Sequence, residues 1–369
     1  MTNYHIGFIL EQTLGHVTHT RNLQMHIARD IDVQAHWGLV PWDVDRTARW
    51  MPLYRNWTVR AGVRARGSIA DILRKTPVDV LFFHTQVPAI LSPDWLRRIP
   101  SVISLDATPL QYDALGQFYN HTPGSPLTER LKSHIHRNCF HAARRLVTWS
   151  YWAKQGLVND YGVPEEKVVV IPPGVTTDIW TRPIPRTPHI GPVKILFVGG
   201  NLARKGGLLL LEAFRQLRPL GVELHLVTRD KLEAEPGLYV YNTMQPNSDE
   251  LKQLYHTSDI FCLPTLGDCL PMVLSEAGAA GLPTVSTSVA AIPEIVKDGR
   301  TGSLVAPGDG AALTEALRRL VLDSDLRIQQ GRRATALVAT EFDAKHNAQR
   351  LLDVLKQEAD AVPTRWKLA

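Results

Sequence analysis

Residues 195–214 read ILFVGGNLARKGGLLLLEAF, and this stretch decides the fold. It opens with a short apolar run, passes through Gly199 and Gly200 into a polar loop, and continues from Gly206 with apolar residues at helical spacing. A buried strand that turns through glycines into a helix is typical of the βαβ unit, in which successive strands lie parallel. The stretch therefore predicts an α/β domain with a parallel sheet.

The same alternation of short apolar runs and longer helical patterns extends along the whole chain. It predicts strands at 6–10, 78–84, 102–106 and 145–150, and then at 194–199, 222–227, 260–264, 284–287 and 302–305. Two such series predict two doubly wound, Rossmann-like domains whose ligands bind in a cleft beyond the carboxyl ends of the strands.

The expected domain boundaries follow from the length and from a proline-rich stretch. A chain of 369 residues is too long for one ordinary core, and residues 181–192, TRPIPRTPHIGP, contain four prolines. This stretch reads as a stiff linker. We therefore expect a first domain at residues 1–183, a second at 184–345, and a C-terminal helix and tail at 346–369 that pack back on the first domain.

The composition is that of an ordinary globular protein, with 44% hydrophobic and 21% charged residues. No apolar stretch is long enough to span a membrane, and the N-terminus lacks a secretory signal pattern, so we expect a cytoplasmic location. The three cysteines, Cys139, Cys262 and Cys269, are never in CxxC spacing, which argues against disulfides and zinc knuckles.

One segment, residues 46–75, is strongly basic, with eight Lys or Arg residues and Asp71 as its only acid. Two interpretations stay open: a solvated basic face, or a surface that meets an acidic acceptor or an anionic membrane and holds the protein peripherally at the inner membrane face. No base-reading motif accompanies the charge, so we expect no nucleic-acid partner. Four apolar residues would share one face if the segment were helical: Trp50, Leu53, Tyr54 and Trp57.

The glycine loop of residues 199–206 ends in two cations, Arg204 and Lys205. Adjacent cations beside the start of a helix make a site for a diphosphate, because the free amides and the helix dipole favour anions there. The loop matches neither GxxxxGK[ST] nor GxGxxG, and on the residues alone a solvated Arg-Lys pair is equally consistent.

A second constellation lies at residues 267–281, GDCLPMVLSEAGAAG. Pro271 suits the start of a helix and Gly281 its end, which places Asp268 in the preceding loop and Glu276 more than one turn inside. Carboxylates and helix-start amides so arranged can hold a diol, a hydroxyl and phosphate oxygens of one ligand. Two acids alone also permit a glycoside hydrolase pair.

Three blocks in the second half resemble the retaining glycosyltransferases of the GT-B fold (glycosyltransferase family 4, group 1 type), which use nucleotide-sugar donors and an E-x7-E motif, here D-x7-E. They are FVGGNLARKGG, SDIFCLPTLGDCLPMVLSEAGAAGLPTV and IPEIVKDGRTGSLVAPGD. In the first half, VTWSYWAKQGLVNDYGVPEEKVVVIPPGV resembles the family's stretch before the interdomain linker. The resemblance implies an acceptor-binding first domain and a donor-binding second domain.

The resemblance also implies roles for individual residues. Lys205 matches the phosphate-binding lysine, Glu276 the glutamate that holds the ribose, and Asp268 the acid that contacts the transferred sugar. Further donor-side residues are Gly15 near the diphosphate, Met272 and Val273 through their amides, and Gly200, Arg204, Met244 and Leu270.

Three positions depart from the family pattern. Asp268 is one methylene shorter than the usual glutamate. The arginine expected just after the strand is absent, which leaves Arg204 to supply its charge. Leu105 occupies the place of a histidine, so Asp106, His16 and His84 become the candidates on the acceptor side.

The family's route is a same-face displacement in which preorganised cations and amides stabilise the departing diphosphate without a metal. It implies Asp268, Lys205, Arg204 and Asp106 as catalytic residues and the nucleotide-diphosphate sugar as a co-substrate, with no cofactor or metal. The acids of DVD at 43–45 read as a surface loop. The alternatives are a hydrolase that uses Asp268 and Glu276, and a nucleotide-sugar-binding protein without transfer activity.

Overall fold

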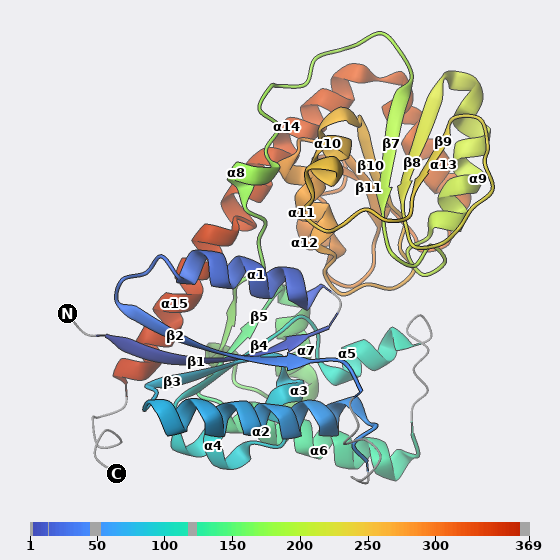
Figure 1. Ribbon diagram of the computed structural model, residues 1–369. Helices are drawn as coiled ribbons and strands as arrows, with labels where there is room; N and C mark the ends of the chain where they lie inside the picture. Colours follow the sequence, from blue (N-terminus) through green and yellow to red (C-terminus); the bar gives the residue numbers. More distant parts are fainter. Residues whose placement is uncertain (1–2, 14, 45–52, 117–123, 362–369) are drawn as a thin grey trace. The chain divides into compact units, whose positions relative to one another are not determined.

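The computed structural model describes residues 3–13, 15–44, 53–116 and 124–361. The chain divides into two compact units (Figure 1). The first unit comprises the chain up to Pro173, except for a short segment that begins at residue 115, and the chain from Ala344 onwards. The second unit comprises Gly174–Asp343 and that short segment. Each unit holds its own sheet.

The first sheet is parallel throughout, in the order β2-β1-β3-β4-β5-β6. Its strands are β1 Tyr4–Gln12, β2 Val33–Pro41, β3 Val80–His84, β4 Ser101–Leu105, β5 Arg145–Thr148 and β6 Val168–Val170. The helices are α1 His16–Ile27, α2 Trp57–Lys75, α3 Gln86–Ala89, α4 Pro93–Arg98, α5 Pro109–Ala114, α6 Pro126–Ala142, α7 Tyr151–Tyr161 and α15 Ala344–Asp360, with a 3-10 turn at Glu165–Lys167.

Alternation along β1 builds a core on both faces of this sheet. Phe8 and Leu10 pack with residues of α1 and α15, whereas Ile9 packs on the opposite side with residues of α2. Successive side chains of a strand point to opposite faces, so a strand covered on both sides reads as a continuous apolar run. GFIL at residues 7–10 is such a run.

The second sheet is also parallel, in the order β12-β11-β10-β7-β8-β9. Its strands are β7 Val193–Val198, β8 Val222–Val227, β9 Leu238–Tyr241, β10 Ile260–Leu263, β11 Thr284–Thr287 and β12 Gly302–Val305. The helices are α8 Thr177–Trp180, α9 Gly207–Leu217, α10 Asp249–Thr257, α11 Met272–Ala279, α12 Ile292–Ile295, α13 Gly310–Leu322 and α14 Ser324–Glu341, with a 3-10 turn at Arg218–Leu220. Two Rossmann-like α/β units are confirmed.

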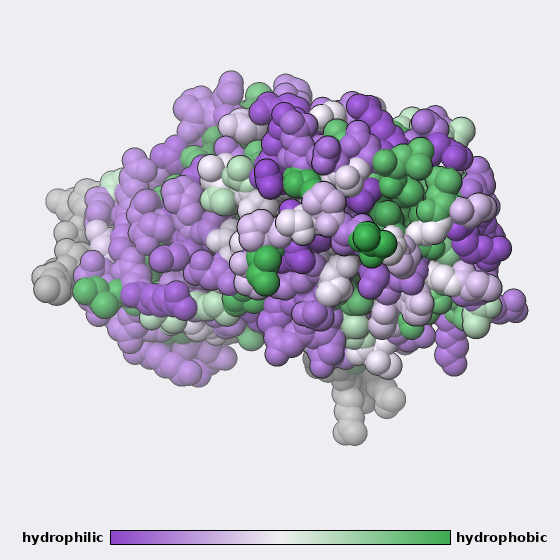
Figure 2. Space-filling model, turned by 90° about the horizontal axis from the view of Figure 1, so that it is seen from above, coloured by the Kyte–Doolittle hydropathy of each residue, from purple (hydrophilic) through white to green (hydrophobic). Residues whose placement is uncertain are grey.

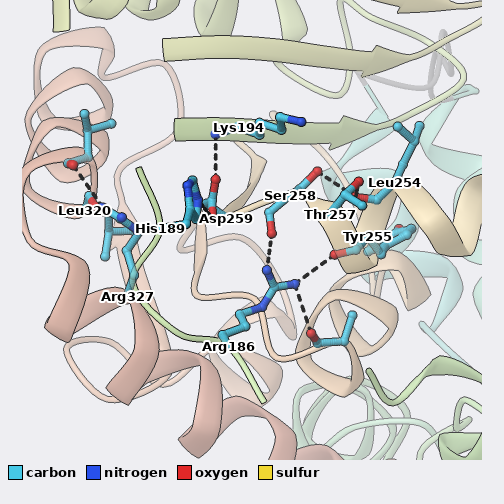
Figure 3. Close-up of polar contacts among 12 residues, drawn as sticks. Arg186, His189, Lys194, Leu254, Tyr255, Thr257, Ser258, Asp259, Leu320 and Arg327 are labelled. Atoms are coloured by element: carbon cyan, nitrogen blue, oxygen red, sulfur yellow. Dashed lines mark hydrogen bonds and ion pairs between the residues drawn. The ribbon is translucent and has the colours of Figure 1, made fainter. Parts of the chain in front are cut away.

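The first unit ends about ten residues earlier than the expected boundary at residue 183, and the proline-rich stretch does not link the units. Residues 181–192 lie against the second unit, where the guanidinium of Arg186 donates to the carbonyls of Ser258, Tyr255 and Ala280 (Figure 3). His189 bonds to Asp259 at 2.8 Å. The prolines of this stretch gave no sign of these anchoring contacts.

The C-terminal helix α15 belongs to the first unit. Arg145 of β5 donates to Glu358 at 2.9 Å, and Arg350 donates to the carbonyl of Val170 at 2.9 Å. Leu351 and Leu355 complete the core against the face of β1 that carries Phe8.

The basic segment carries less free charge than its sequence suggests. Arg60 is 2% exposed, donates to the carbonyls of Tyr54, Arg55 and Trp42, and lies over the Trp42 and Trp57 rings. Arg64 contacts Pro41 and Asp43, Arg66 pairs with Asp94, and Arg74 pairs with Asp71.

The helical face that four apolar residues would share is wrong for Leu53 and Tyr54, because neither lies in a helix. Leu53 has a positive φ of 64°, and α2 begins only at Trp57, after Asn56 caps it by accepting from the Val59 amide. Trp50, together with residues 46–49 of the basic segment and Asp45, lies outside the described residues. Within the described residues, the helix of the basic segment therefore runs only from Trp57 to Lys75.

No helix within the described residues has the length and apolar character needed to cross a bilayer. On the face drawn in Figure 2, hydrophilic residues surround separate hydrophobic patches.

Candidate active site

Two loops at the carboxyl edge of the second sheet hold each other in place. The Leu266 amide donates to the carbonyl of Arg204 at 2.9 Å, which joins the loop after β10 to the loop after β7. Gly206 has φ of +74°, and a Cβ there would lie 1.9 Å from the carbonyl oxygen of Pro264. Only glycine fits this close approach.

This junction brings together the cations and the first acid of the candidate site. Lys205 Nζ forms an ion pair with Asp268 Oδ2, and Arg204 donates to the Gly267 carbonyl at 2.7 Å. The two side chains of the ion pair are 14% and 13% exposed. Two residues that lie 63 positions apart in the sequence thus form one ion pair, which is partly accessible to solvent.

Helix α11 starts directly after this contact. Pro271 is its N-cap residue and makes no side-chain cap, so the first-turn amides of Met272 and Val273 have no partner within the helix. Gly281 follows the helix with φ of +72°, and the Leu282 amide donates back to Ala277 at 2.9 Å. The predicted start and end of the helix are confirmed.

The second acid, Glu276, is 7% exposed and accepts a hydrogen bond from the Tyr255 hydroxyl at 2.9 Å. Burial raises the pKa of Glu276 to about 7, although the Tyr255 hydrogen bond acts in the opposite direction. Burial and the neighbouring carboxylate raise the pKa of Tyr255 well above its usual value. The site thus holds a carboxylate whose ionisation is sensitive to its surroundings.

Three more predicted donor-side residues lie in this unit. Gly200 is exposed at the end of β7, Met244 is half-buried in the loop after β9, and Leu270 is 6% exposed just before α11. The loop after β8 contributes a cation that the sequence did not single out: Arg229 Nε lies 3.6 Å from where a Cβ on Gly200 would be. Arg229 thus places a cation beside Gly200, one of the positions from which the family's arginine is absent.

In the first unit, the acceptor-side candidates His16 and His84 are brought together. Nδ1 of His16 lies 2.6 Å from Nε2 of His84, and Nε2 of His16 lies 3.5 Å from Glu11. The His84 ring stacks on Trp149 with a centroid distance of 5.1 Å. Glu11 directly follows the strand predicted at 6–10, where ligands were expected to bind, whereas Trp149 lies within the strand predicted at 145–150 and was not expected in the site.

Burial controls the charge of this cluster. It lowers the pKa of His84 well below its usual value and that of His19 to about 3, so both rings are neutral near pH 7. It raises the pKa of Glu11, and Asp106 adds to that effect. Gly15, at the start of α1, has open space where a Cβ would be.

No cluster of three or more His, Cys, Asp or Glu side chains suited to a metal occurs in the described part of the chain. The three cysteines are free and buried.

Two Rossmann-like α/β units with parallel sheets are the architecture of the GT-B fold, and family models identify the class of enzyme. A family model described as Glycosyltransferase Family 4 matches residues 15–179, and one described as Glycosyl transferases group 1 matches residues 192–323. The chain belongs to this family of glycosyltransferases.

Among curated proteins, the chain is similar to the MMP alpha-(1->4)-mannosyltransferase of Mycolicibacterium hassiacum. The two are 32% identical over 196 residues, which is 50% of this chain and 47% of the relative. The chain spans about half the length of the curated relatives it matches.

Solved structures show the same fold at low identity. Sucrose-phosphate synthase from Thermosynechococcus elongatus matches with a TM-score of 0.75 and 14% identity, covering 98% of this chain and 100% of that one. Anabaena HepE in complex with UDP-glucose matches with a TM-score of 0.69 and 16% identity, covering 96% and 99%.

Proposed function

We propose that this chain is a retaining glycosyltransferase that moves a hexose-type sugar from a UDP- or GDP-sugar to a hydroxyl of a glycan, lipid or small molecule. The observation that carries the proposal is the Lys205–Asp268 ion pair beside the uncapped start of α11. Family membership, the mannosyltransferase name of one relative and the UDP-glucose of one structural neighbour point the same way.

The ion pair marks where phosphate and sugar of the donor would meet. Lys205 is the group for the diphosphate and Asp268 the group for a sugar hydroxyl, so the bond between sugar and phosphate belongs between them. The first-turn amides of Met272 and Val273 add donors for the phosphate oxygens. Arg204 and Arg229 supply further positive charge, and Glu276 accepts from the ribose.

The reaction then needs electrostatic stabilisation more than a strong base. The bond between the anomeric carbon and the phosphate oxygen breaks while the acceptor oxygen bonds to the same face of that carbon. The acceptor proton passes to the departing phosphate oxygen. Lys205, Arg204 and the amides stabilise the charge that develops on the diphosphate. We therefore propose metal-independent transfer with Lys205, Arg204, Asp268 and Asp106 as catalytic residues.

The acceptor side is proposed for the first unit, at His16, His84 and Asp106, with Gly15 nearby on the donor side. Asp106 is partly exposed and can accept a hydrogen bond from a hydroxyl group, whereas His84 is 0% exposed and would act through its contact with His16. His16 links this group to Glu11.

Two alternative functions compete with glycosyl transfer, and the first of them explains less. A hydrolase needs Asp268 and Glu276 to flank a glycosidic bond, yet one is paired with Lys205 and the other is buried against Tyr255. A nucleotide-sugar-binding protein without transfer activity fits the donor residues equally well. A measurement of donor turnover distinguishes such a binding protein from an enzyme.

The variant Asp268→Ala separates sugar contact from nucleotide binding. We expect it to abolish transfer while UDP or GDP affinity changes less than about threefold, because the acid faces the sugar rather than the nucleotide. Asp249→Ala, at an exposed acid of the same unit that pairs with Lys252, is the matched control. A loss of nucleotide affinity with unchanged turnover would contradict the assigned role. Proton NMR of the product gives its anomeric configuration, and inversion would exclude the retaining route.

A further inference from the structure

Glu276 is supported by helix α10, which lies outside the sequence blocks quoted for the family resemblance. Tyr255 projects from α10 into the core, is 0% exposed, and donates its hydroxyl to Oε2 of Glu276 at 2.9 Å. This bond takes one of the two carboxylate oxygens, so a ribose diol would meet the other.

The position of Tyr255 is itself fixed on three sides. Its ring stacks on Phe261 of β10 with a centroid distance of 5.6 Å, and Trp180 of α8 meets it edge-on at 5.1 Å. Its carbonyl accepts from Arg186 at 2.9 Å, as Figure 3 shows. A hydroxyl held so firmly fixes the direction in which the carboxylate turns.

We propose that Tyr255 is a positioning residue for the nucleotide ribose, whose hydroxyl orients the Glu276 carboxylate and favours its ionised, hydrogen-bond-accepting form. The inference rests on the proposed function, since the ribose belongs to the donor. It extends that function by naming the group outside the donor loops that sets how strongly the ribose is held.

Among the groups around the Glu276 carboxylate, the Tyr255 hydroxyl is the one that favours its ionised form. Burial raises the pKa of Glu276 to about 7, and the Tyr255 hydrogen bond lowers it. His256, next in the chain, turns to the carbonyl of Trp180 at 3.1 Å, and Arg186 binds main-chain carbonyls. In Tyr255→Phe the ring and its stacking stay while the hydroxyl is lost, so the pKa of Glu276 rises further.

The first test needs no ligand. Carboxyl-carbon NMR of the protein labelled at glutamate follows the titration of Glu276, which is assigned by its absence in Glu276→Gln. We expect the midpoint in Tyr255→Phe to lie about one pH unit above that of the wild type. Tyr241→Phe, which loses a hydroxyl contact to His225 in the same unit, should leave the midpoint unchanged. Equal midpoints in the wild type and Tyr255→Phe would overturn the proposal.

The second test measures binding of UDP and of GDP between pH 6 and pH 9. A shift of one pH unit in a group that titrates near 7 makes Tyr255→Phe bind about fivefold more weakly at pH 7 and almost normally at pH 9. Inorganic pyrophosphate, which lacks the ribose, should bind both proteins equally, and in a Glu276→Gln background the second substitution should have no effect.

A uniform loss of affinity at every pH, shared by pyrophosphate, would indicate a structural role only and would overturn the proposal. If neither nucleotide binds the wild type, the proposed function fails, while the Glu276 titration still decides the role of Tyr255.

Discussion

At the scale of single residues, the site is a set of charges held by tertiary contacts. Lys205 and Asp268 neutralise each other in a partly shielded position, and Glu276 sits deeper beside Tyr255. The sequence predicted that these three residues serve one ligand, because two strand-exit loops at one sheet edge must lie close. It did not predict Tyr255 or Arg229, since neither spacing nor composition shows which side chain of α10 or of the loop after β8 will face the site.

Lys205→Ala removes one member of the ion pair. We expect affinity for UDP or GDP to fall at least about tenfold, because the diphosphate loses a charged partner and the carboxylate of Asp268 is left without its cation. Lys252→Ala, which breaks an exposed pair with Asp249 in the same unit, is the control. Isothermal titration calorimetry checks both, and equal affinities of the two variants would remove Lys205 from the diphosphate site.

The variant Glu276→Gln tests how the free energy of unfolding depends on pH. The folded protein binds a proton at Glu276 up to a pH of about 7, whereas the unfolded chain releases it near the ordinary value of 4.5. Wild-type stability therefore falls as pH rises through that window, and glutamine removes the effect. Urea unfolding at pH 5 and pH 8 should show Glu276→Gln gaining up to about 3 kcal/mol relative to the wild type. A relative stability independent of pH would contradict the raised pKa.

At the scale of elements, all the central strands could be predicted, whereas of the four edge strands only β12 was. The three strands absent from the sequence prediction, β2, β6 and β9, all lie at sheet edges. A central strand is buried on both faces and reads as an apolar run, whereas VQAHWGLVP of β2 is interrupted by polar residues and VVV of β6 is very short. The place of the proline-rich stretch in the second unit was not predicted either, because Arg186 anchors it to residues that are far away in the sequence.

Arg186→Met tests that anchor. The guanidinium satisfies carbonyls of Tyr255, Ser258 and Ala280, and its loss leaves them without this donor while methionine keeps the aliphatic stem. We expect destabilisation of the second unit by about 2–4 kcal/mol, measured by urea unfolding. Arg182→Met, in the same stretch, should change stability by less than about 1 kcal/mol. Similar effects for the two variants would show that Arg186 is not a specific anchor.

At the scale of the whole molecule, two parallel α/β units carry separate sets of polar residues at their sheet edges. The second unit concentrates cations, helix-start amides and two acids, which suits an anionic nucleotide sugar. The first unit holds a histidine cluster in which burial keeps His19 and His84 neutral near pH 7, and we propose that this cluster supports the hydroxyl acceptor. The sequence predicted the donor set in more detail because the family's motifs lie there, whereas the histidine cluster depends on long-range contacts such as that of His16 with His84.

The most direct measurement is nucleotide release from UDP-hexoses and GDP-hexoses, each with and without a panel of glycan, lipid-extract and small-molecule acceptors, in the presence of EDTA. Glycosyl transfer by the proposed residues predicts acceptor-dependent release of UDP or GDP by the wild type and by Lys252→Ala, and release at least about a hundredfold slower by Lys205→Ala. Nucleotide binding without release for every pair of donor and acceptor, or an unchanged rate in Lys205→Ala, would contradict it.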